Sequence, residues 1–129
     1  MIRKIENGIT IDYGKINWID QNNVVFGYDD VRHCCEHCGW GVYNPRTRER
    51  VADSPDGLPY HFDFDAGAKE NDEEPFQGDV TDWVQVVLVS DDDPDKKLIL
   101  ECWCEHNGYY YHDFSFKKHD EKIIEKKLY

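Results

Sequence analysis

The chain has no uninterrupted apolar run of the roughly 18 residues that a membrane-spanning helix needs. Its first residues, MIRKIENGITIDYG, contain neither the apolar core nor the small-residue cleavage site of a secretory signal. These absences predict a cytosolic protein without a membrane partner. They also predict a reducing environment, in which clustered cysteines more often bind metal or carry redox chemistry than form disulfides.

Basic residues are almost absent from one third of the chain. Between Asp53 and Asp95 there are fourteen Asp and Glu residues and a single base, Lys69, which gives this stretch a net charge of −13. The whole chain has a net charge of −12, so this stretch holds all of the excess negative charge. A nucleic-acid-binding surface needs the opposite sign, and direct nucleic-acid binding is therefore not expected. The stretch is either a solvated acidic loop or a surface that competes with nucleic acid for a basic partner.

What the chain does contain is typical of a globular protein. Apolar residues make up 40% of the 129 residues and aromatic residues 14%, enough to bury the core of a single domain over residues 1–129. Residues 82–90 and 97–105 predict two strands joined by the turn DDDPDKK. Asn107-Gly108 is a strong hairpin signal and predicts a third strand over 109–117. Residues 82–117 are therefore predicted to form an antiparallel meander.

The remaining segments predict shorter elements. Residues 8–13 and 23–28 predict two strands. Asn44-Pro45 is typical of a helix start and predicts a short helix that ends near Ala52. Residues 53–82 are expected to form a long acidic loop, with one candidate strand in YHFDFD, and residues 118–129 a short amphipathic helix. The expected fold is α+β, a meander with one or two short helices stapled by a structural zinc site.

The zinc site is predicted from the cysteines, three of which lie in the stretch HCCEHCGWG. The spacing C-x-x-C-G from Cys35 to Gly39 is that of a zinc knuckle, in which two thiolates meet one ion. Cys102 and Cys104 leave the same face of a predicted strand and can supply the second pair. The predicted zinc ligands are Cys35, Cys38, Cys102 and Cys104, with His33, His37 and His106 as alternatives.

Two other uses of the cysteines stay open. They can be core residues, because cysteine is among the most buried residue types. A catalytic thiol would need a histidine base, and the chain has six histidines, although no nucleophile signature surrounds any cysteine. A calcium loop starting at Asp91 is excluded, because its sixth position is Lys96 instead of glycine and its twelfth is Cys102 instead of glutamate.

Two further stretches of the chain are VRHCCE and LECWCEHNGYYYHDFSF, the second of which contains an Asn-Gly-Tyr-Tyr hairpin. Together they resemble a family of small uncharacterised proteins of phages and prophages. The family pattern lacks cysteines at the positions of Cys38, Cys102 and Cys104, so the full zinc set would be particular to this chain. The chain is also similar to zinc-containing anti-CRISPR proteins that act on type II effectors. The residues that carry the family resemblance are His33, Cys34, Cys35, Glu36, Trp103, Glu105, Asn107, Gly108, Tyr109 and Tyr110.

The resemblance implies a counter-defence role in a phage-infected host. A type II effector holds its RNA–DNA heteroduplex in a positively charged channel, which attracts an acidic surface. The expected function is inhibition of this nuclease by blocking target DNA loading, without catalysis and with zinc as cofactor. The alternatives are a thiol- or zinc-dependent enzyme, an accessory module for another host protein, and an interface made by Tyr109 to Tyr111. The acidic residues expected to contact the partner are Asp63, Asp65, Glu70, Asp72, Glu73, Glu74, Asp91, Asp92 and Asp93.

Overall fold

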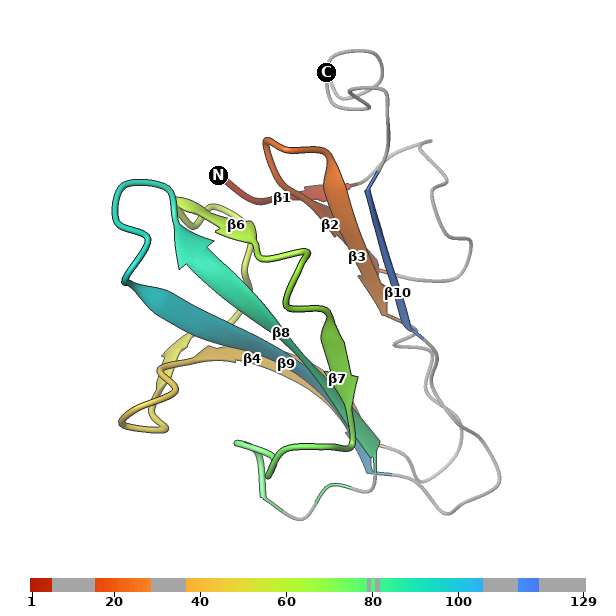
Figure 1. The fold of residues 1–129 in the computed structure, drawn as a ribbon. Helices are drawn as coiled ribbons and strands as arrows, with labels where there is room; N and C mark the ends of the chain where they lie inside the picture. The colour runs from red at the N-terminus through yellow and green to blue at the C-terminus, as the bar shows by residue number, and fades with distance from the viewer. Residues whose placement is uncertain (6–15, 29–36, 79, 81, 106–113, 119–129) are drawn as a thin grey trace.

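The computed structural model describes residues 1–5, 16–28, 37–78, 80, 82–105 and 114–118. In these residues the chain forms two antiparallel β-sheets that pack against each other (Figure 1). All regular elements in this part of the chain are strands, and none is a helix. The expected α+β fold is therefore wrong, and the described chain is all-β.

The smaller sheet, sheet A, has four strands in the order β1–β2–β3–β10. Its hairpin of β2 and β3 turns at Asp20, whose carboxylate accepts the backbone N–H groups of Asn22 and Val24. The other oxygen of Asp20 accepts the N–H of Phe62 in the second sheet, so the same turn also ties the two sheets together. The strands of sheet A are β1 (Arg3–Ile5), β2 (Ile16–Ile19), β3 (Val24–Tyr28) and β10 (Phe114–Lys118).

The larger sheet, sheet B, has six strands in the order β5–β4–β9–β8–β6, and β7 also pairs with β8. The nine-residue strands β8 and β9 are its longest elements and lie at its centre, as Figure 1 shows. The strands of sheet B are β4 (His37–Tyr43), β5 (Arg50–Ala52), β6 (Tyr60–Phe62), β7 (Ala68–Glu70), β8 (Asp82–Ser90) and β9 (Lys97–Glu105).

The core between the sheets is built from aromatic rings of sheet A and aliphatic side chains of sheet B. The Phe26 ring is fully buried and lies about 6 Å from the rings of Trp18 and Phe116. Trp18 meets Trp40 of sheet B edge to face at 5.5 Å, a favourable arrangement for two aromatic quadrupoles. The aliphatic side of the core is made by Val42, Val84, Val86, Leu88 and Leu100.

The segment predicted as a helix from Asn44-Pro45 is the tight turn between β4 and β5. The Asn44 side-chain oxygen accepts the backbone N–H groups of Arg46 and Thr47, as a helix cap would. The chain then reverses at Arg48, whose φ is 64°, and the N–H of Asn44 donates to the carbonyl of Glu49. Asparagine makes the same local hydrogen bonds in turns and in helix caps. The predicted helix is therefore wrong, and the segment is a turn.

The predicted meander is partly confirmed. The β8–β9 hairpin has the expected bounds, but β10 pairs with β3 in sheet A, and the second neighbour of β9 is β4. The stretch predicted as a long loop contains β6 and β7, which pair with successive parts of β8. The expected strand over 8–13, the turn at 107–108 and all of the expected C-terminal helix except Lys118, which ends β10, lie outside the described residues.

Candidate functional site

Cys38 and Cys104, two of the predicted zinc ligands, are joined by a disulfide in this structure. They are paired directly across β4 and β9, and both are buried. The hydroxyl of Tyr28 in sheet A donates to the Cys104 sulfur at 3.3 Å, so the disulfide lies between the two sheets. Cys102, two residues away, is fully buried and is not part of this disulfide. The prediction that Cys102 and Cys104 share a face is confirmed, since both belong to the core.

The disulfide restricts when zinc can bind. Zinc takes thiolate ligands, and a sulfur in a disulfide is not a thiolate, so the predicted site requires the reduced chain. Cys35, His33, His106 and the side chain of His37 lie outside the described part. Among the side chains that the structure describes, no group of three or more Cys, His, Asp or Glu is arranged to hold a metal ion. Zinc stays a prediction about the reduced protein.

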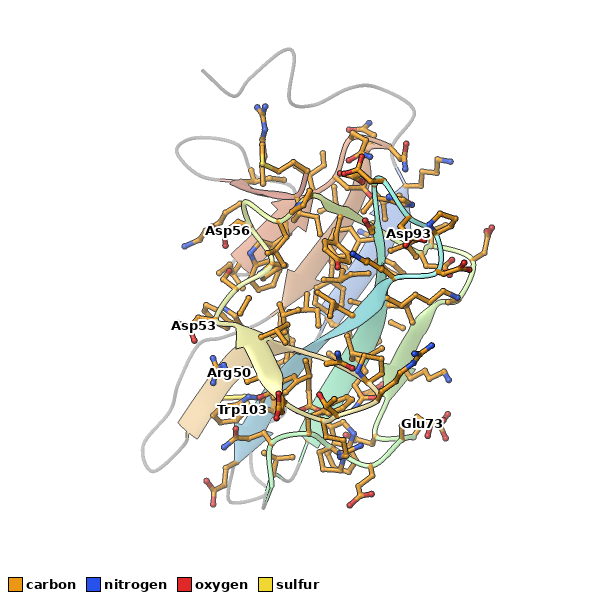
Figure 2. The ribbon with its side chains drawn as sticks, turned by 90° about the vertical axis from the view of Figure 1, so that its left-hand side faces the viewer. Arg50, Asp53, Asp56, Glu73, Asp93 and Trp103 are labelled. Carbon is orange, nitrogen blue, oxygen red and sulfur yellow. A yellow bond between two sulfur atoms is a disulfide. The ribbon has the colours of Figure 1, made fainter. Side chains whose placement is uncertain are left out.

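The acidic residues singled out in the sequence follow one edge of sheet B. Tyr60 of β6 pairs with Ser90 at one end of β8, and Glu70 of β7 pairs with Val84 near its other end. At about 3.3 Å per residue, nine-residue β8 is roughly 27 Å long. Figure 2 shows Asp93 and Glu73 near opposite ends of the same side of the molecule. We call the set the acidic edge: Asp63, Asp65, Glu70, Asp72, Glu73, Glu74, Asp91, Asp92 and Asp93.

The members of the acidic edge differ in how free their carboxylates are. Glu70, Asp72 and Glu74 are exposed, and their side chains make no hydrogen bond or ion pair with the described residues. Glu73 is paired with Lys69 at 3.5 Å, and Lys69 is the single base of the acidic stretch. A partner can therefore reach Glu70, Asp72 and Glu74 without breaking an internal contact, and the same holds for Asp65 and Asp92, which are also exposed.

Asp91 already has partners within the molecule. Its carboxylate accepts hydrogen bonds from Gln21 at 2.8 Å and from the amine of Met1 at 3.0 Å, and it lies 2.9 Å from Nδ1 of His61. Burial raises the pKa of this carboxyl, but these hydrogen bonds outweigh burial and lower the pKa to about 2. Asp91 therefore stabilises its end of the sandwich, and a partner would have to compete for it.

Residues 71–78, which we call the acidic loop, are fixed to the outer face of sheet B. The Trp83 N–H donates to the Asn71 side chain at 2.7 Å, and the Trp83 indole donates to the carbonyl of Glu73 at 2.8 Å. Phe76 stacks on Tyr43 with ring centroids 4.9 Å apart, and the guanidinium of Arg48 lies 4.3 Å from the Phe76 centroid. The loop is therefore held by both backbone and side-chain contacts.

Glu101, which was not among the site residues predicted from the sequence, lies between sheet B and the acidic loop and binds the loop backbone. Its carboxylate is fully buried and accepts the backbone N–H groups of Phe76 and Gln77, each at 2.9 Å, and the side-chain amide of Gln85 at 2.8 Å. The signal in the sequence that could have identified it was a glutamate in the middle of the apolar strand KLILECWCE.

The hydroxyl of Tyr43 lies in the same region of sheet B. Burial raises its pKa, and the charge of Glu101 raises it further, whereas the charge of Arg50 lowers it.

A hollow of about 320 Å³ separates the acidic loop from the β4–β5 turn and β7. Its floor includes Val87 and Ile99, and its rim includes Arg48, Lys69 and Glu73. Arg48 and Lys69 already interact with Phe76 and Glu73, respectively. No cysteine, serine or histidine is among the residues that line this hollow.

The described residues form no helix that is long and apolar enough to cross a membrane. No protein-family model matches the chain, and comparison with curated proteins and with solved structures finds no match.

Proposed function

We propose that the protein is a phage counter-defence protein that binds a host immune nuclease and inhibits it. The expected target is a type II RNA-guided DNA nuclease, and the expected effect is a block of target DNA loading. The observation that carries the proposal is the acidic edge, because carboxylates from three connections of the chain follow one side of sheet B.

Charge is the physical basis of this recognition. A nuclease of this class holds nucleic acid in a positively charged channel, and a row of carboxylates is attracted to the same surface. Opposite charges raise the association rate most at low salt, because counter-ions screen them over about 8 Å at physiological ionic strength. The binding should therefore weaken as salt rises, and target DNA should compete with the protein.

A binding role fits the described cysteines better than the thiol-enzyme alternative does. A nucleophilic thiol must be reachable by its substrate. Cys102 is fully buried, and Cys38 and Cys104 are consumed in a disulfide. The carboxylates of Glu70 and Asp72, by contrast, are exposed and can meet a partner without any change in the fold.

The experiment compares two pairs of neutralised residues in titrations against the nuclease at rising salt. The edge pair is Glu70→Gln with Asp72→Asn, and the control pair is Asp53→Asn with Asp56→Asn. Figure 2 shows Asp53 and Asp56 on the side of the molecule opposite Glu73. Both pairs change the net charge equally, so a difference between them measures local contact and not overall charge.

The edge pair should weaken binding and flatten its salt dependence, whereas the control pair should change both only slightly. Each rim charge contributes about 0.2–1 kcal/mol, so neutralising Glu70, Asp72, Glu73 and Glu74 together should cost about tenfold or more in affinity. Equal effects of the two pairs, or an affinity that does not change with salt, would show that the acidic edge is not the interface. The aromatic residues 109–111, outside the described chain, would then be the next candidate.

A further inference from the structure

Glu101 is a buried ionisable residue that is not part of the acidic edge. Its neighbours in β9, Leu100 and Cys102, belong to the core between the sheets. Because successive side chains of a strand point to opposite faces, Glu101 points to the outer face of sheet B. It is nevertheless fully buried there, because the acidic loop covers it.

The hydrogen bonds of Glu101 are directed at the loop backbone. One carboxylate oxygen accepts the N–H of Phe76 and the other accepts the N–H of Gln77. Gln85 donates to Glu101 and also to the carbonyl of Glu74, so the two buried side chains together contact three residues of the acidic loop. Phe76 and Gln77 each donate to a separate oxygen of Glu101, whereas an amide would present one oxygen and one NH2 group, and the NH2 group cannot accept an N–H.

We infer that Glu101 is a positioning residue that holds the acidic loop in its partner-binding conformation. This inference depends on the proposed function for its binding part. A loop that is ordered before binding loses less conformational entropy when the partner docks, which raises affinity without adding a contact. Glu101 itself touches no partner, since it lies beneath the loop.

The test uses Glu101→Gln, with Asp20→Asn as its matched control. Asp20 is also a buried carboxylate that accepts backbone N–H groups, those of Asn22 and Val24 in the β2–β3 turn and that of Phe62 in β6, but none from the acidic loop. Amide hydrogen exchange of the free protein is read at Phe76 and Gln77 for the loop and at Val24 for the control turn. Binding of each variant to the nuclease is then measured by titration.

Glu101→Gln should speed exchange at Phe76 and Gln77 by about tenfold or more, with no such change at Val24, and should weaken binding about five- to tenfold. Asp20→Asn should speed exchange at Val24 and leave binding close to that of the wild type. If Glu101→Gln fails to fold, Gln85→Leu removes the amide that contacts both Glu101 and the loop, and it should produce the same pattern more weakly.

The outcomes separate this inference from the proposed function. Unchanged exchange at Phe76 and Gln77, or wild-type affinity in a variant whose loop exchanges faster, would overturn the positioning role. Equal losses of binding in Glu101→Gln and Asp20→Asn would also overturn it, since they would indicate a general loss of stability. Failure of the wild-type protein to bind the nuclease would overturn the proposed function, and with it the binding part of the role of Glu101.

Discussion

Cys38 and Cys104 are joined by a disulfide although the ladder of β4 and β9 already places them directly opposite each other, with Cα atoms 4.1 Å apart. In the folded protein the bond therefore links two strands that would be adjacent without it. In the unfolded chain it ties together residues separated by 66 positions. Its main contribution to stability is expected through the unfolded state.

Reduction of the Cys38–Cys104 disulfide should lower the free energy of unfolding by about 2–4 kcal/mol in the absence of metal, because the unfolded chain gains freedom. Urea unfolding with and without reductant measures this difference. The control is the double variant Cys38→Ser with Cys104→Ser, which should not respond to reductant. An equal response of the control and the wild type would contradict the assignment of the bond.

Zinc should bind only after reduction, because the ligands must be thiolates. In reductant we expect about one zinc per chain, bound by the four cysteines predicted from the sequence, and a rise in thermal stability when the metal is added. Elemental analysis and melting curves of the reduced and the oxidised protein give the answer. A reduced protein that carries no zinc and gains no stability from it would exclude the site.

Gly39 should not tolerate a side chain. A Cβ at this position of β4 would lie 2.7 Å from Cζ2 of Trp103, closer than real contacts allow. Gly39→Ala should therefore displace the indole and cost about 1–3 kcal/mol of stability, with a change in tryptophan fluorescence. Gly78→Ala is the control, because nothing lies within 4 Å of its added Cβ. Similar stabilities of the two variants would show that Trp103 can move at little cost.

Protonation of Asp91 should make the protein less stable in acid. Its pKa is lowered to about 2 from the ordinary value of 3.8, so its ionised form stabilises the fold. This contribution is complete above about pH 4 and is lost as the pH falls toward 2. Unfolding measured between pH 5 and pH 2 should show a smaller loss for Asp91→Asn than for the wild type, with Asp92→Asn as the control. Parallel curves for Asp91→Asn and the wild type would contradict this role.

The sequence by itself determined the features that depend on neighbouring residues. The bounds of β8 and β9 were predictable, because long β-rich segments flank an Asp-rich turn. The shared face of Cys102 and Cys104 followed from the two-residue period of a strand. The concentration of negative charge between Asp53 and Asp95 was predictable from the residue counts, but its arrangement along one edge of sheet B was not.

The tertiary structure decided everything that joins distant segments. The pairing of β10 with β3, and not with β9, depends on which faces can be buried together, and no local pattern encodes it. The same holds for Cys38, whose partner is the residue that the sheet places opposite it, and for Glu101, which is buried because a distant loop covers it. Asn44 shows that even a local pattern can be ambiguous, since its side-chain hydrogen bonds fit a turn and a helix cap equally well. The pairing of β4 with β5 selects the turn.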